Sequence, residues 1–169
     1  MKTCIIIVED KPEEQEKALA AVMSALSLTR GGAPIECAND IFEKFLGTRL
    51  IPCWDSLIFT ADNLDGFLQY APPFQEGMQF EKTLILTDLM FPQRKGEKEN
   101  MNGLQVVIEA IERGISVVVC SDTDHHDLPF MPRLIRTLEK SHLKGRIPVV
   151  LDNKDWEKAI VLGLELLGS

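Results

Sequence analysis

The stretch Ile5-Ile6-Ile7-Val8-Glu9-Asp10 decides the fold of this chain, because an uninterrupted apolar run ends in two acids. Apolar residues without polar alternation are typical of a strand that is buried on both faces, as in a parallel sheet. The strands of an open α/β sheet bring their carboxyl ends to one edge, where such sheets build their sites. We therefore expect Glu9 and Asp10 at that edge.

Three further apolar segments end in polar groups in the same way. The predicted strands cover residues 84–87, 117–120 and 148–151, and the groups that follow them are Asp88, Ser121 and Lys154. If these strands run parallel to the first, the carboxylates, the hydroxyl and the ammonium converge although they are far apart in the chain.

Helical patterns alternate with the predicted strands. Helices are expected from Pro12 to the pair Gly31-Gly32, at about 40–46, at 63–70, from Asn102 to Gly114, around 132–141, and along the stripe Trp156, Ile160, Leu164 and Leu167. Strands that alternate with helices predict an α/β protein whose parallel sheet is covered on both faces. The second strand of the sheet is either 35–38 or 56–60, and the patterns do not choose between them. The polar segment 93–102 is expected to be a loop.

Composition sets limits on the class of protein. The chain has 169 residues, a mass of 19.0 kDa and a formal net charge of −8, and it lacks the basic face of a nucleic-acid-binding protein. No apolar run is long enough to span a membrane, and Met1-Lys2-Thr3 leads directly into the first strand, so no signal peptide is expected. The widely spaced cysteines suggest neither a zinc site nor a disulfide framework. We expect a cytoplasmic protein of one domain.

The ordered set of motifs resembles the response-regulator receiver domain. The matching pieces are Ile-Ile-Ile-Val-Glu9-Asp10, Leu-Thr-Asp88-Leu-Met-Phe-Pro92, Ser121 after the fourth strand and Lys154 after the fifth. The resemblance implies a flavodoxin-like three-layer α/β/α sandwich with a five-stranded parallel sheet. It further implies a single receiver-like domain over residues 1–169, with insertions at about 47–82 and 93–102.

The resemblance also implies a role for each site residue. Asp88 would be the phosphoacceptor, and Mg²⁺ would be held by Glu9, Asp10, Asp88 and the backbone carbonyl of Met90. Ser121 and Lys154 would contact the phosphoryl group. These roles agree with elementary chemistry, because a carboxylate and a phosphoryl group repel each other until a hard cation with oxygen ligands neutralises them.

A receiver of this kind would be a stand-alone switch and not an enzyme, capable at most of its own phosphorylation and dephosphorylation. Its phosphoryl group would come from a sensor histidine kinase or a phosphotransfer protein. Phosphorylation would change the surface that a downstream protein partner binds. A homodimer through the last helices is also possible on this interpretation.

The sequence departs from the receiver pattern at several positions. Asp155 follows Lys154 where the family has proline, Leu151 replaces an aromatic residue, and Gly103 comes after an enlarged loop. Asp122 stands after Ser121 where the family has a small residue. An extra carboxylate beside a phosphoryl group should slow or restrict phosphorylation unless a cation compensates, and Asp122→Ala should then speed it.

Two other functions are compatible with the sequence. The chain could be a receiver-like binding module that is never phosphorylated. Alternatively, Asp122, Asp124, His125 and His126 resemble part of the signature of manganese-dependent phosphoesterases, although no histidine precedes His125 to complete the N-terminal metal motif of that family. A polar loop without a metal is the simpler interpretation of this string.

Overall fold

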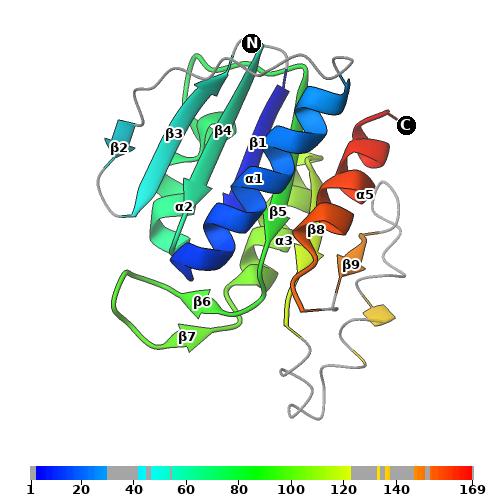
Figure 1. Ribbon diagram of the computed structural model, residues 1–169. Coiled ribbons are helices and arrows are strands. Elements are labelled where there is room, and N and C mark those ends of the chain that lie inside the picture. The colour runs from blue at the N-terminus through cyan, green and yellow to red at the C-terminus, as the bar shows by residue number, and fades with distance from the viewer. Residues whose placement is uncertain are drawn as a thin grey trace.

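The computed structural model describes residues 3–29, 42–44, 47–53, 55–122, 133, 136–137, 147–150 and 153–168. Its central strand is β1 (Thr3–Val8), which pairs in parallel with β4 (Ser56–Ala61) on one side and β5 (Lys82–Thr87) on the other (Figure 1). Beyond β5 lie β8 (Ser116–Cys120) and β9 (Val149–Val150), again in parallel. The parallel order β4-β1-β5-β8-β9 is that of a flavodoxin-like sheet.

The second parallel strand is β4, at Ser56–Ala61, and all its residues are buried. This settles the choice that the sequence left open, while residues 35–38 lie outside the described residues. The range 47–82, expected as an insertion, therefore contains a strand and a helix that belong to the sheet architecture itself.

The sheet is wider than the five strands expected, because an antiparallel extension makes it seven-stranded. Strand β3 (Thr48–Cys53) pairs antiparallel with β4, and β2 (Phe42–Lys44) pairs antiparallel with β3. The prediction of a helix at about 40–46 is thus wrong, because Phe42–Lys44 form a strand. Strand β3 was not predicted because it contains Pro52, and proline weakens a strand prediction. It is tolerated because β2 pairs only with Thr48–Leu50, which leaves that side of Pro52 without a strand partner in the described chain.

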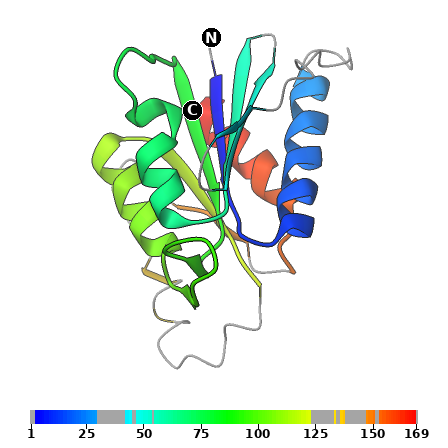
Figure 2. The ribbon, with the colours of Figure 1, turned by 90° about the vertical axis from the view of Figure 1, so that its left-hand side faces the viewer.

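Helices cover both faces of the sheet, as expected (Figure 2). One face packs against α1 (Pro12–Thr29) and α5 (Trp156–Gly168), with Ile5 and Ile7 of β1 in that core. The other packs against α2 (Leu64–Tyr70) and α3 (Gly103–Arg113), with Ile6 and Val8 on that side. A short 3-10 helix, Pro72–Phe74, follows α2. The protein therefore has the three-layer α/β/α architecture.

The segment 93–102, expected as a loop, is part of a small hairpin. Strands β6 (Phe91–Pro92) and β7 (Glu99–Asn100) pair antiparallel. Ion pairs from Arg94 to Asp65, at 2.9 Å, and from Lys95 to Asp62, at 3.3 Å, attach the hairpin to the start of α2. The insertion after Asp88 is therefore anchored beside the carboxyl edge of the sheet.

The described cysteines differ in whether they form a disulfide bond. Cys4 and Cys120 are free, buried thiols, and burial raises the pKa of Cys4 to about 12. Cys53 in β3 is disulfide-bonded, which the wide spacing of the cysteines did not predict.

Among the described residues, no helix has both the length and the apolar composition needed to cross a membrane. Most of the helix expected around 132–141 lies outside the described residues, as do Leu151, Asp124, His125 and His126.

Candidate functional site

The candidate site lies at the carboxyl edge of the parallel strands. There the backbone pairing continues one residue past each strand: the N–H of Glu9 donates to the carbonyl of Ala61, that of Asp88 to Val8, and that of Ser121 to Val150, at 2.9–3.0 Å. The residues that end the strands are therefore fixed by the sheet itself, which brings together positions that are far apart in the sequence.

Lys154 binds two carboxylates from different strands. Its Nζ lies 2.6 Å from Oε2 of Glu9 and 2.8 Å from Oδ2 of Asp88. All three residues are at most 3% exposed, so these contacts are shielded from water. Buried charges are tolerated only when paired in this way. The lysine predicted to meet Asp88 does so, and it contacts Glu9 as well.

The second oxygen of the Asp88 carboxylate is also bonded. Oδ1 accepts hydrogen bonds from the Ser121 hydroxyl and from the backbone N–H of Leu89, both at 2.7 Å. Ser121 is fully buried. Asp88 is therefore held at both oxygens by an ammonium, a hydroxyl and an amide, which are groups that stabilise negative charge.

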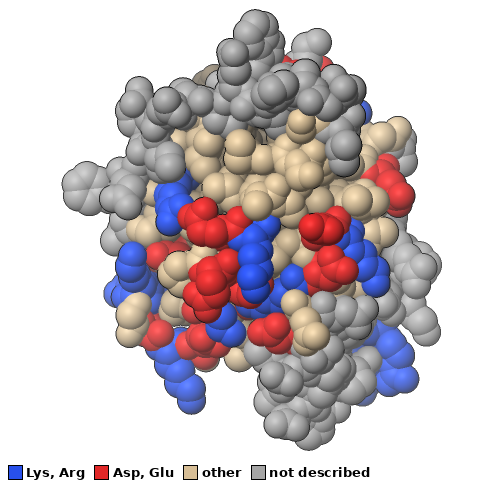
Figure 3. Space-filling model, in the orientation of Figure 1, with Lys and Arg blue, Asp and Glu red and all other residues tan. Residues whose placement is uncertain are grey.

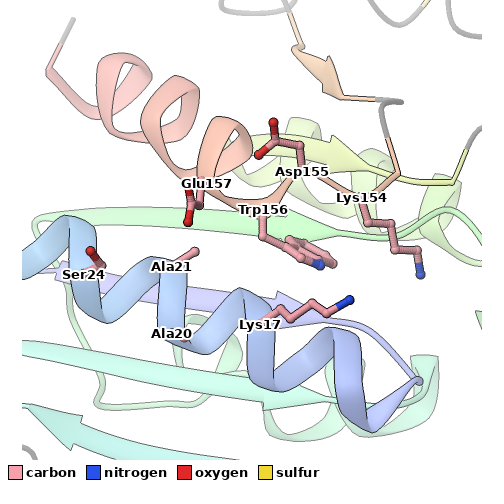
Figure 4. A pocket seen from close by; sticks show the side chains of 8 residues that line it. All are labelled: Lys17, Ala20, Ala21, Ser24, Lys154, Asp155, Trp156 and Glu157. Atoms are coloured by element: carbon pink, nitrogen blue, oxygen red, sulfur yellow. The ribbon is translucent and has the colours of Figure 1, made fainter.

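Two consecutive left-handed residues aim Lys154 at the carboxylates. Asn153 has φ 49° and Lys154 has φ 52°, a conformation that costs a lysine about 1–2 kcal/mol. The backbone dihedrals of these two residues therefore set the direction of the lysine side chain, and no peptide bond among the described residues is cis. Asp155, at the position where the receiver pattern would have proline, caps α5 by accepting the N–H of Lys158 at 2.9 Å. In Figure 4 the Lys154 ammonium points away from α5 and past the Trp156 ring.

The backbone of Asp88 is held in place by the close approach of the backbone at Gly103. A Cβ at Gly103 would lie 2.1 Å from the carbonyl oxygen of Asp88, so only glycine fits where α3 begins. The Thr87 hydroxyl donates to the same carbonyl at 2.8 Å. Asn102 occupies the N-cap position predicted for α3, but its side chain donates to the carbonyl of Phe91 instead of capping the helix.

Asp10 differs from the other acids because its Oδ1 is buried and has no hydrogen-bond partner. Oxygens of Glu9, Asp10 and Asp88 lie within 4.8 Å of one another. Around an octahedral Mg²⁺ ion, neighbouring oxygens are about 3.0 Å apart and opposite ones about 4.2 Å, so the three carboxylates would move closer together to bind one ion. Carboxylate oxygens are ligands that such a hard cation prefers. The donor set therefore fits a hard divalent cation, although it is not specific to Mg²⁺.

The protonation of the acids is coupled to burial and to their neighbours. Burial, together with the Asp88 charge, raises the pKa of Glu9 to about 8 despite the nearby ammonium. Burial and the charge of Glu99 raise the pKa of Asp10. Burial acts to lower the pKa of Lys154, but Asp88 and Glu9 outweigh it and raise that pKa above its usual value. The site thus holds more negative charge than Lys154 alone neutralises.

Several residues at the site were missed by the sequence analysis. Lys11 donates its backbone N–H to Oε1 of Glu9 at 3.0 Å, and its ammonium lies 3.6 Å from Oδ2 of Asp122. Gln15 is buried and donates to the carbonyl of Glu9 at 3.0 Å. Glu99 of the inserted hairpin is close enough to Asp10 for its charge to help raise the pKa of that acid. Of these residues, only Lys11 could have been identified from the sequence, because it directly follows the acids Glu9 and Asp10.

The remaining predicted residues stand as follows. Met90 lies two residues past Asp88, between β5 and β6, with its side chain partly buried. Asp122 faces Lys11 at the surface. The string that includes Asp124, His125 and His126 cannot be placed relative to the site, because these residues are outside the described part of the chain.

Comparisons with models of protein families, with curated proteins and with solved structures find no match to this chain.

Proposed function

We propose that this protein is a receiver in which Asp88 accepts a phosphoryl group in a magnesium-dependent way and thereby switches a protein–protein contact. The observation that carries the proposal is the buried group of Asp88, Ser121 and Lys154 next to the acids Glu9 and Asp10. A carboxylate held at a strand end by an ammonium and a hydroxyl is arranged for nucleophilic attack on phosphorus.

The proposed step forms one bond and breaks one. An oxygen of Asp88 attacks the phosphorus of the donor, and the bond from phosphorus to the leaving group breaks with its electron pair on that group. An acyl phosphate results. Bound Mg²⁺ would supply neutralising positive charge, held by Glu9, Asp10, Asp88 and the Met90 carbonyl. Lys154 and Ser121 bond the two carboxylate oxygens of Asp88, and from these positions their charge and hydrogen bond would stabilise the product.

The switch follows from a competition for the same donors. Ser121 and Lys154 bond Asp88 in the unmodified protein, and a phosphoryl group offers them new oxygens farther out. An arrangement in which they follow those oxygens is favoured only after phosphorylation, so the modification shifts a population. The donor would be a sensor histidine kinase or a phosphotransfer protein, and the reader a downstream protein or a second copy of this chain. The cytoplasm is the proposed compartment, and it makes the disulfide at Cys53 unusual.

Intact-mass measurement after treatment with acetyl phosphate tests this proposal. We expect one phosphoryl adduct that needs Mg²⁺, is lost in base and is absent in Asp88→Asn. Asp62→Asn is the matched control, because Asp62 follows the carboxyl end of the neighbouring strand β4 and pairs with Lys95. An adduct that persists in Asp88→Asn would contradict the assignment of the acceptor.

One observation favours the alternative of a binding module that is never phosphorylated. Lys154 pairs with both Glu9 and Asp88, so it occupies carboxylate oxygens that a metal ion would otherwise bind. In that case Mg²⁺ with beryllofluoride, a stable mimic of the phosphoryl group, would leave the melting temperature of the protein unchanged. A rise in melting temperature that disappears in Asp88→Asn would support phosphorylation instead.

A further inference from the structure

A salt bridge spans two segments that both carry site residues. The ammonium of Lys11 lies 3.6 Å from Oδ2 of Asp122, and the two side chains are 39% and 32% exposed. Lys11 directly follows Asp10, and Asp122 directly follows Ser121. The pair therefore joins the loop after β1 to the end of β8 at the surface beside the buried acids.

Lys11 is better placed than its neighbours to neutralise Asp122. Lys154 is engaged by Glu9 and Asp88 in the interior. Lys17 is also near enough to Asp122 for that charge to contribute to its raised pKa, but its ammonium bonds Glu14 at 2.6 Å. The pair of Lys11 and Asp122 thus presents opposite charges next to a site that already contains several carboxylates.

We propose that the Lys11–Asp122 pair sets the selectivity of Asp88 for the charge of its phosphodonor. This inference rests on the proposed function and adds the specificity of the same site. Asp122 repels an anionic donor and Lys11 attracts it, so the pair is close to neutral as long as both are present. Removing one partner leaves a net charge at the surface, next in the chain to Asp10 or to Ser121, which a charged donor would meet.

The electrostatic account predicts a dependence on donor charge. Because Coulomb energy is proportional to charge, the logarithm of the rate change should be about twice as large for a dianionic donor as for a monoanionic one. Acetyl phosphate is a dianion at neutral pH, and phosphoramidate is mainly a monoanion. In each case Asp88 forms the bond to phosphorus, and acetate or ammonia leaves with the electron pair, the nitrogen taking a proton from solvent.

The experiment compares initial labelling rates of the full chain with the two donors at saturating Mg²⁺. We expect Lys11→Ala to slow labelling by acetyl phosphate about fivefold and by phosphoramidate about twofold. Changes of this size correspond to the interaction energies of exposed ion pairs. Asp122→Ala should speed both reactions in the same proportion. The double variant should return to the wild-type ratio, because the two changes cancel in charge. Higher ionic strength should reduce every difference.

Charge-matched controls separate this effect from a general change in net charge. Lys82→Ala lies at the opposite end of β5 from Asp88, and Glu109→Ala removes a surface partner of Arg113 on α3. Both should leave the ratio of the two rates unchanged.

The inference is overturned if Lys11→Ala and Asp122→Ala leave that ratio within the range of the controls, or if the single variants shift it in the same direction. It also falls if the wild type gains no base-labile phosphoryl group, but that result is distinguishable, since it removes the proposed function itself. Unchanged circular dichroism spectra establish that each variant is folded.

Discussion

The two halves of the site handle charge in opposite ways. In the buried half, Lys154 bonds Glu9 and Asp88, and Ser121 completes the hydrogen bonds of Asp88. In the exposed half, Asp10 has a buried oxygen without a partner, while Lys11 and Asp122 form a longer, partly solvated pair. The buried half is saturated with internal partners, whereas the exposed half has an acidic oxygen that a ligand could bind.

This difference indicates a division of labour. Groups whose bonds are satisfied internally hold Asp88 in place and cost the fold a great deal if one is removed. Groups that are partly solvated contribute little to stability and act on what approaches the site. On this account the buried half determines where the reaction takes place, and the exposed half determines which ion and which donor arrive.

The largest effect should come from breaking the buried half. Lys154→Met leaves Glu9 and Asp88 without their shared cation and should lower the free energy of unfolding by about 3–5 kcal/mol in the absence of metal. Added Mg²⁺ should recover more stability in this variant than in the wild type. Chemical denaturation with and without Mg²⁺ measures both quantities. Lys82→Met is the control at the far end of β5, and a loss no larger than that of the control would contradict the division proposed here.

Asp10→Asn tests the exposed half. We expect the affinity for Mg²⁺ to fall about tenfold or more, because the oxygen without a partner is the one best able to take a cation. The metal-free protein should not be destabilised, since burial already penalises the charged form of Asp10. Calorimetric titration gives the affinity, with Asp62→Asn as the control. An unchanged affinity would remove Asp10 from the ligand set.

The pH dependence of stability tests the strength of the buried cluster. The pKa of Glu9 rises from its usual 4.5 to about 8, so the folded state retains a proton that the unfolded chain loses. The stability that this proton confers is complete below pH 4.5 and is lost as the pH rises toward 8. The slope is at most about 1.4 kcal/mol per pH unit.

Glu9→Gln should flatten the curve of unfolding free energy against pH over this window. The raised pKa of Lys154 acts at higher pH and does not affect the slope there. Mg²⁺ affinity should increase toward pH 8, as Glu9 becomes ionised. A wild-type curve that rises across the window would show that Glu9 is charged in the folded protein throughout.

The smallest effect should come from Lys11→Ala in the exposed half. Partly solvated ion pairs contribute about 0.2–1 kcal/mol, so the free energy of unfolding should fall by no more than this. The contrast with Lys154→Met compares a buried lysine that has two carboxylate partners with a partly exposed lysine that has one. Equal losses for the two lysines would erase the distinction between the halves.

The sequence predicted those parts of the site that depend on the ends of parallel strands. Apolar runs ending in Glu9, Asp88 and Ser121 are enough to place these groups together, because hydrogen bonding between parallel strands aligns the strand ends. The contact of Lys154 with Glu9 was not predicted, since it depends on the backbone dihedrals of Asn153 and Lys154. Residues whose position comes from side-chain contact alone, such as the pair of Lys11 with Asp122, leave almost no pattern in a sequence.

The fold was predictable to a similar extent and for similar reasons. Buried parallel strands appear as continuous apolar runs and the helices between them show a helical period. Among the described residues these patterns matched the structure, except that the helix expected at about 40–46 is wrong and the choice of the second strand was left open. The antiparallel edge was missed because β2 is only Phe42–Lys44 and β3 contains Pro52. Short edge strands are specified mainly by their partners, so local sequence carries little information about them.

The most direct test is a crystal structure of the protein with Mg²⁺ and beryllofluoride. We expect beryllium on an oxygen of Asp88, one metal ion bound by Glu9, Asp10 and Asp88, and both Lys154 and Ser121 turned toward the fluorides. Beryllofluoride absent from Asp88 at saturating concentration, with Lys154 still bridging Glu9 and Asp88, would contradict it.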